Sequence, residues 1–197
     1  MEVFALAIYA AWLFAAFGVR TALHWRKTGD SGWRGLSGRF GSAEWLAGVL
    51  FVVALVVGVL GPTLVLWGHK EIARSSVVGI VGSALALFGV GLTVAAQLSM
   101  RDSWRIGVDS SERTELRTTG LFGAVRNPIF SAMALTATGL MLMVPTVVSL
   151  VGLFALFVAL QLQVRVVEEP YLLRTHGEFY EKYCRSAGRF VPRIGTK

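Results

Sequence analysis

The sequence predicts an all-α integral membrane protein with five transmembrane helices and a further cytoplasmic helix near the C-terminus. Apolar residues make up 54% of the 197 residues, above the ~45–50% of soluble domains, and the mean hydropathy is +0.61. Long apolar runs alternate with short basic segments, and the basic residues fall almost entirely in alternate connections. The length suits a single domain, residues 1–197.

Five apolar runs are long enough, or nearly so, to cross a bilayer core of about 30 Å, which takes about 20 helical residues. Pro145 alone separates the last two runs, which predicts a tight antiparallel hairpin. The fourth run is short and could begin nearer Phe122, with Pro128 as a kink or a start signal. The first run is interpreted as a retained helix, because no basic segment precedes it as in a signal peptide. The five predicted spans are Glu2–Val19, Trp45–Leu66, Val77–Leu98, Ile129–Val144 and Thr146–Val164.

Lysine and arginine predict the orientation. If the chain crosses five times, 17 of its 19 basic residues lie on one side and only Lys70 and Arg74 lie on the other. Positive charge gathers in cytoplasmic loops, so the N-terminus is predicted outside and the C-terminus in the cytoplasm. Trp25, Trp45 and Trp67 fall at the predicted interfaces, as membrane tryptophans commonly do. We therefore expect an integral protein of the plasma (inner) membrane.

Two further segments are predicted on the cytoplasmic side. Met100–Arg126 is polar and could form a small β-hairpin around a turn-rich centre. Pro170–Arg185 is predicted to be a helix, because Pro170 suits a first helical position and acidic residues precede it. One face of this helix is apolar and aromatic, so it needs a partner, either the membrane surface or the ends of the bundle. That face carries Leu172, Leu173, His176, Phe179, Tyr180 and Tyr183.

Composition argues against several kinds of site. Cys184 is the single cysteine, so neither an intrachain disulfide nor a zinc site of several cysteines can form. The three histidines lack ligand-like spacing, so no metal is expected. The net charge of +7 belongs to loops beside apolar runs, so no nucleic-acid partner is expected.

The acidic pair Glu168 and Glu169, which follows Arg165 at the end of the last span, is the strongest candidate for a site. Carboxylates at a membrane edge are costly unless they are hydrated or paired. One interpretation is that they stabilise the N-terminus of the tail helix through its dipole, by ~0.3–1 kcal/mol each. The other is that they bind a cationic or hydroxyl-bearing ligand, with Arg165 as a salt-bridge partner, a basic flank or a substrate-facing cation.

Three other features have both structural and functional interpretations. Arg126, Asn127 and Pro128 could be an ordinary helix start or part of a site. The Gly89-Val90-Gly91 segment in the third span could allow close helix packing or the approach of a ligand. Gln97, near the cytoplasmic end of the same span, could face a cavity.

Taken together, these motifs resemble a known family of membrane enzymes. From Gly120 the chain reads Gly-Leu-Phe-Gly-Ala-Val-Arg-Asn-Pro-Ile-Phe, and from Arg165 it reads Arg-Val-Val-Glu-Glu-Pro-Tyr-Leu-Leu-Arg-Thr-His-Gly-Glu-Phe-Tyr-Glu-Lys-Tyr, with Arg-Phe-Val-Pro from Arg189. The combination resembles the isoprenylcysteine carboxyl methyltransferase and phospholipid methyltransferase superfamily. The resemblance covers about the C-terminal half, which divides the domain into an N-terminal two-helix part (1–76) and a methyltransferase-like core (77–197).

The resemblance implies S-adenosylmethionine as cofactor, in a pocket that opens to the cytoplasm. We predict catalytic roles for Arg165 and Asn127. Three positions depart from the family pattern: Asn127 stands where His is usual, Phe130 where Tyr is usual, and His176 where Phe is usual. The first two departures could indicate a different substrate. The predicted cofactor-binding residues are Gly89, Gly91, Gln97, Gly120, Leu121, Val125, Arg126, Asn127, Pro128, Phe130, Glu168, Glu169, Leu172 and Tyr180.

The predicted function is therefore an S-adenosylmethionine-dependent membrane methyltransferase that acts on a lipophilic small molecule or a lipid, with the lipid bilayer as its surroundings. One alternative is an NADPH-dependent membrane reductase of the sterol-reductase type, whose C-terminal architecture is similar. The acidic pair and the short N-terminal half favour methyl transfer. Another alternative is a non-enzymatic scaffold or a small transporter, which would need no cofactor-sized pocket.

Overall fold

The structure is a computed structural model that describes residues 1–32, 35–36, 38–100 and 115–196. Within these ranges every regular element is helical, apart from two isolated β-bridges, Val125 with Gly188 and Val191 with Ile194. This confirms the all-α prediction. Most of the predicted hairpin in Met100–Arg126 lies outside the described residues.

The first helix is longer than predicted. It consists of α1 (Glu2–Leu13), a π-helical segment η1 (Phe14–Val19) and α2 (Arg20–Thr28), which together form 27 continuous residues. The predicted end at Val19 is therefore nine residues early. The helix continues because no glycine or proline follows until Gly29, which adopts a φ of 74° and ends it.

The second and third long helices lie where the sequence places them. They are α3 (Ala43–Leu66) and α4 (Ser76–Ser99), each of 24 residues. Each begins with a serine cap: the Ser42 hydroxyl accepts from a backbone N–H at 3.2 Å, and the Ser75 hydroxyl does so at 3.5 Å. Such caps satisfy a backbone donor that the first turn leaves unpaired.

The predicted hairpin is also present. The short helix α5 (Leu121–Ala124) precedes α6 (Pro128–Met143), whose first residue is a proline, and α7 (Val147–Leu162) follows after a short turn at Pro145. Proline at the first helical position loses no hydrogen bond, because that N–H has no partner within the helix.

The tail helix predicted at Pro170–Arg185 is wrong at its start and is interrupted within its length. α7 continues through a π-helical segment η3 (Gln163–Glu168) into α8 (Glu169–His176), and a separate helix α9 (Glu178–Ser186) follows. Proline inside a helix removes one hydrogen bond and its ring clashes with the preceding turn. The wider π-helical turn just before Pro170 accommodates both effects. The break comes instead at Gly177, with a φ of 50°.

Four of these helices are long and apolar enough to cross a membrane: Glu2–Thr28, Ala43–Leu66, Ser76–Ser99 and Val147–His176. The fifth predicted span, α6, is apolar but has 16 residues. At 1.5 Å per residue it is about 24 Å long, short of a bilayer core of about 30 Å. Integral membrane character is therefore supported, while the count of five spans stays a prediction.

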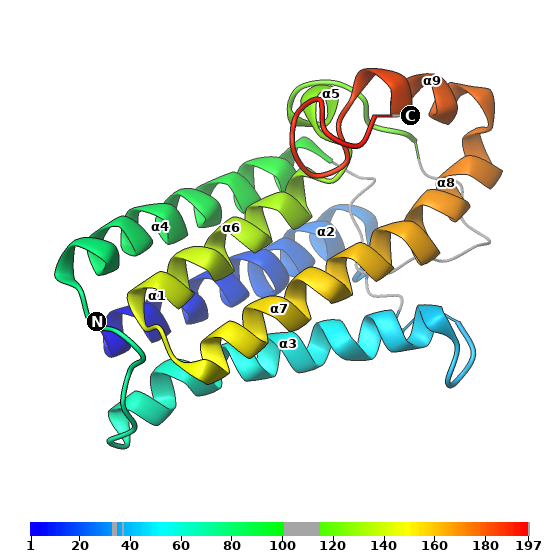
Figure 1. Ribbon diagram of the computed structural model, residues 1–197. Coiled ribbons are helices and arrows are strands. Elements are labelled where there is room, and N and C mark those ends of the chain that lie inside the picture. The colour runs from blue at the N-terminus through cyan, green and yellow to red at the C-terminus, as the bar shows by residue number, and fades with distance from the viewer. Residues whose placement is uncertain (33–34, 37, 101–114, 197) are drawn as a thin grey trace.

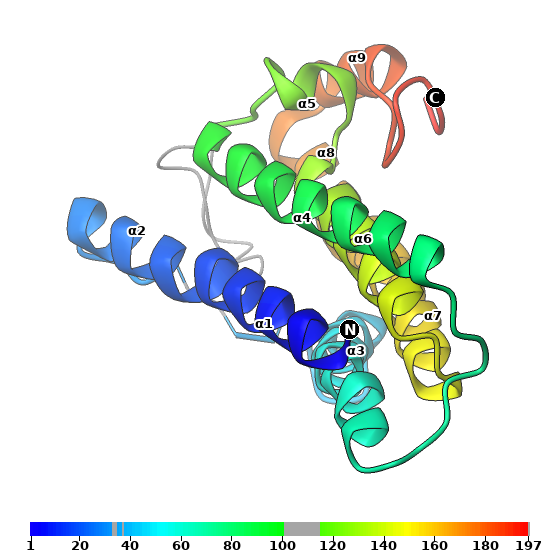
Figure 2. The same cartoon turned by 90° about the vertical axis from the view of Figure 1, so that its left-hand side faces the viewer.

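The two ends of the bundle differ. Figures 1 and 2 show α5, α9 and the C-terminus at one end, and the N-terminus with the α3–α4 and α6–α7 connections at the other. The backbone N–H of Ile72 donates to the carbonyl of Pro145 at 2.7 Å, which ties these two connections together. This arrangement agrees with the partition of loops inferred from the basic residues. Which end faces the cytoplasm stays a prediction.

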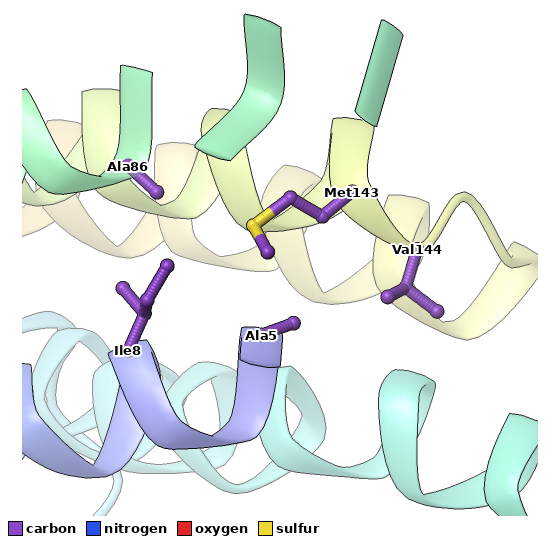
Figure 3. Close-up of a cluster of buried hydrophobic side chains, with 5 residues drawn as sticks. All are labelled: Ala5, Ile8, Ala86, Met143 and Val144. Atoms are coloured by element: carbon purple, nitrogen blue, oxygen red, sulfur yellow. The ribbon is translucent and has the colours of Figure 1, made fainter. Parts of the chain in front are cut away.

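Small residues bring the helices close. α4 packs along α6, and α3 packs along α7. A Cβ at Gly139 of α6 would lie 2.4 Å from the backbone nitrogen of Ala86 on α4, so a larger side chain cannot fit there. At the end remote from α9, α1 also packs against α4 and α6 (Figure 3). The buried cluster there consists of Ala5, Ile8, Ala86, Met143 and Val144.

Candidate functional site

A cavity of about 950 Å³ lies among the first helix, α3, α6 and the α8–α9 end of the bundle. Ligand pockets usually occupy ~300–1,000 Å³, so this one could hold a cofactor together with part of a second molecule. One part of its wall is apolar and includes Tyr9, Leu13, Phe17, Phe51, Leu55, Val59, Ile129, Phe130 and Met133. Another part is polar and includes Gln97, Glu115, Arg117, Arg126, Asn127, Gln163, Glu168 and Glu169.

Arg126 organises the polar part of the wall. It lies between α5 and α6, and its side chain is only 2% exposed. Its guanidinium donates to three backbone carbonyls: those of Cys184 at 3.0 Å, Ala187 at 2.7 Å and Gly195 at 3.1 Å. It also donates to the Glu169 carboxylate at 3.2 Å. A guanidinium presents its donors in a rigid planar fork, so these contacts fix the position of the side chain and of the segments it touches.

Glu169 forms a second ion pair, with Arg189. The Arg189 guanidinium donates to one carboxylate oxygen at 2.7 Å and to the other at 3.0 Å, a bidentate arrangement. Hydrogen bonding to Glu169 is the main reason that the pKa of Arg189 is raised. Two guanidiniums thus share one carboxylate whose side chain is 11% exposed. The other acid of the pair, Glu168, is half-buried and lines the same cavity.

The segment after α9, residues 187–195, runs back over the start of α6, and we call it the C-terminal strap. Asn127 holds it twice, since both its backbone N–H (3.1 Å) and its side-chain amide (3.0 Å) donate to the carbonyl of Arg189. The Ser131 hydroxyl donates to the carbonyl of Phe190 at 2.6 Å. Gly188 pairs with Ala124 through its N–H at 3.1 Å. The side-chain amide of Asn127 therefore holds the backbone of the strap.

Two tyrosines of α9 close the same region. The Tyr183 hydroxyl donates to the carbonyl of Phe122, and the rings of Tyr180 and Tyr183 meet edge to face with centroids 6.2 Å apart. Both residues are buried and line the cavity. Burial raises the pKa of Tyr180 and of Tyr183. Both phenols are therefore protonated, neutral groups at physiological pH.

Gln97 connects the cavity with the first helix. Its side-chain amide donates to the carbonyl of Ala16 at 3.0 Å, and Ala16 lies in the π-helical segment η1. Wider π-helical turns are often found at functional sites. The Trp12 indole N–H donates to the Thr93 hydroxyl at 3.3 Å one turn deeper, so the first helix and α4 are joined at two levels.

Comparison with protein-family sequence models matches residues 77–178, just over half of the chain, to phospholipid methyltransferase. The chain belongs to the phospholipid methyltransferase family. Among solved structures, it is similar to the eukaryotic intramembrane Ras methyltransferase ICMT (isoprenylcysteine carboxyl methyltransferase), determined without a monobody. The TM-score is 0.63 at 19% identity, over 98% of this chain and 67% of that one, which establishes a shared fold. No curated protein sequence matches the chain.

The cavity brings together nine of the fifteen residues that the sequence singles out. They come from the end of α4, the start of α6, the η3–α8 junction and α9, so the fold collects elements that are far apart in the chain. Their contacts with a cofactor stay a prediction. The nine residues are Gln97, Arg126, Asn127, Pro128, Phe130, Glu168, Glu169, Leu172 and Tyr180.

Six predicted residues do not line the cavity. Gly89 packs α4 against α6, since a Cβ there would lie 2.4 Å from the Thr136 hydroxyl, whereas a Cβ at Gly91 would meet nothing within 4 Å. Arg165 is exposed, and its guanidinium donates to the Gln161 side chain at 2.9 Å. A role for these residues in the chemistry stays a prediction. The other three are Gly120, Leu121 and Val125, in and around α5.

The dipole interpretation of the acidic pair does not fit the fold. Glu168 and Glu169 lie inside the continuous helix Val147–His176, where no free helix N-terminus is present. A helix dipole acts mainly within the first and last turns. The contacts of Glu169 with Arg126 and Arg189 give this carboxylate a different role.

Sequence reasoning assigned no role to Arg189 and none to the first helix. Arg189 belongs to a quoted motif, but nothing in the spacing shows that the strap folds back onto Glu169. Tyr9, Leu13 and Phe17 are spaced by four residues, which places them on one helix face. The spacing did not distinguish this face from the others, because nearly every residue of the segment is apolar.

Proposed function

We propose that this protein is an S-adenosylmethionine-dependent methyltransferase that acts on a lipophilic small molecule or a lipid. The single observation that carries the proposal is the divided wall of the cavity, polar on one part and apolar on another, in a chain that belongs to a methyltransferase family. Family membership does not favour the reductase or scaffold alternatives.

The residues of the polar part fit such a methyl donor. S-adenosylmethionine supplies a methyl group on a sulfonium, and it also carries an ammonium, a carboxylate and ribose hydroxyls. Glu168 can accept from the ammonium or the hydroxyls, and the amides of Gln97 and Gln163 can bind polar edges. Glu169 contributes through the ion pairs that hold Arg126 and the strap in place.

The aromatic and aliphatic residues of the cavity would orient the reactants and exclude water. Phe130, Leu172 and Tyr180 adjoin the polar residues, where a dry wall strengthens the electrostatic contacts beside it. In-line methyl transfer depends strongly on the placement of the acceptor behind the methyl group. Rigid anchoring of Arg126 and Tyr183 by backbone carbonyls supports that placement.

The apolar part fits a hydrocarbon chain. Several of its residues on α3 line the cavity and are exposed: Val52 is 51% exposed, Val56 59% and Leu60 43%. α3 crosses the apolar layer, so an opening beside these residues would face lipid tails. A lipophilic acceptor could therefore reach the cavity sideways from the bilayer.

Ligand binding in detergent tests the proposal. A ligand at 100 times its Kd adds about 2.7 kcal/mol of stability, so S-adenosylhomocysteine should raise the melting temperature of the purified protein and NADPH should not. Glu168→Gln should lose most of this shift, whereas Glu181→Gln, an exposed acid on α9, should keep it. Stabilisation by NADPH alone would overturn the proposal. Transfer of radiolabelled methyl to a lipid extract then identifies the acceptor.

We also propose that the α8–α9 end of the bundle faces the cytoplasm, where the methyl donor is made. The distribution of basic residues supports this orientation. In a Cys184→Ser background, a cysteine at Thr196, which is exposed, should react with a membrane-impermeant maleimide only after the cells are opened. Labelling in intact cells would reverse the orientation.

A further inference from the structure

The C-terminal strap lies outside the segment matched to the family, 77–178, and Arg189 is not among the residues that line the cavity. Its side chain is nevertheless only 12% exposed and donates two hydrogen bonds to Glu169, which does line the cavity. We propose that Arg189 is a positioning residue for the donor site: it fixes the Glu169 carboxylate and thereby couples the strap to the polar wall. This inference rests on the proposed function.

The backbone of Arg189 is held on both sides, so its side chain starts from a fixed point. Its carbonyl accepts from the backbone and side-chain N–H groups of Asn127, and its own N–H donates to the carbonyl of Ile194 at 2.8 Å. The bidentate pair then sets the plane of the Glu169 carboxylate as well as its position. Arg126 alone contacts a single oxygen, at 3.2 Å, and leaves that plane undefined.

Glu169 lies next to Glu168 in the same helical turn, so the backbone that carries one carries the other. Misplacement of a binding group by about 1 Å can cost up to about 100-fold in activity. Loss of the Arg189 fork should therefore weaken donor binding even where the protein stays folded. A strap that only stabilises the fold would not have this effect.

Arg189→Lys tests the inference with little risk to folding, because lysine keeps the positive charge beside Glu169 but loses the planar fork. We expect S-adenosylhomocysteine to bind this variant about 10-fold more weakly than wild type, measured by calorimetry on folded protein. Arg185→Lys, an exposed arginine on α9, is the matched control and should bind as wild type does. Equal affinity of Arg189→Lys and wild type would overturn the inference.

Cys184 supplies an independent check on folding. It is buried, it is the single cysteine of the chain, and its carbonyl is held by Arg126. In Arg189→Lys it should react with maleimide as slowly as in wild type. Fast labelling with a matching loss of affinity would show a merely structural role and would refute the positioning role. If wild-type protein binds no S-adenosylhomocysteine, the proposed function itself fails, and the inference fails with it.

Discussion

Glu169→Gln is the substitution whose consequence the structure defines best. Glutamine keeps the shape of the side chain but removes its charge, so two guanidiniums would face each other without a carboxylate between them. The side chain of Arg126 is 2% exposed and that of Arg189 is 12% exposed. Arg126 cannot turn to water, because its two terminal nitrogens also donate to the carbonyls of Cys184, Ala187 and Gly195.

Removing one partner of a buried ion pair usually costs ~3–5 kcal/mol. We expect about 3 kcal/mol here, the lower end, because the Arg189 side chain is partly exposed and can move toward solvent. For a chain of this length 1 kcal/mol shifts the melting temperature by ~2–4 °C, so the expected loss is ~6–12 °C.

Thermal unfolding in detergent, followed by the reactivity of Cys184, measures this loss. Glu181→Gln is the control and should stay within ~0.5 kcal/mol of wild type. A melting temperature of Glu169→Gln within 2 °C of wild type would refute the ion-pair argument, since ~1 kcal/mol is all that such a shift allows.

Three further predictions follow from other parts of the bundle. Burial raises the pKa of Tyr183 above its ordinary 10.0, so the folded state holds this proton more tightly than the unfolded state does. The contribution of Tyr183 to the free energy of unfolding should therefore be fully present below about pH 10 and should be lost as the pH rises above it. Melting temperatures from pH 8 to 11 measure this loss, and Tyr183→Phe should show a flatter decline from a starting stability about 1 kcal/mol lower. Gly89→Ala adds a methyl group 2.7 Å from the backbone nitrogen of Thr136 and should cost ~1–3 kcal/mol, whereas Gly91→Ala meets nothing within 4 Å and should leave the melting temperature unchanged. Leu13→Trp narrows the apolar part of the cavity and should raise the KM for a lipophilic acceptor while binding of S-adenosylhomocysteine stays unchanged.

Much of the fold could be predicted because the core of each long helix is an apolar run and short polar segments separate these runs. The helices α3 and α4 begin within two residues of the predicted starts. The prediction of helix ends failed where packing between helices outweighed a local sequence preference. Pro170 reads as a helix start, but the π-helical turn before it lets the helix pass through. Such a turn depends on packing between helices, which a single sequence does not reveal.

The residues of the candidate site could be predicted where they belong to a sequence motif. The contacts between distant segments could not be predicted. The segment from Arg126 to Phe130 and the acidic pair both reach the cavity wall. The same residues cannot reveal that Asn127 holds a backbone carbonyl of the strap, because that partner lies 62 residues away in sequence. Gly91 illustrates the opposite case: its spacing from Gly89 suggests a shared role, yet the two lie on different sides of α4.

The two parts of the cavity come from different parts of the chain. The polar wall is built largely from the segment matched to the family, while the apolar wall owes most of its residues to α1, η1 and α3, which precede that segment. Polar groups select a ligand by charge and hydrogen bonds, whereas an apolar wall discriminates by volume, at ~1–3 kcal/mol per methylene. If the proposed function is right, the choice of acceptor therefore lies in the N-terminal helices. Exchange of α1 and α3 for those of another family member should change which acceptor is methylated without changing the affinity for the donor.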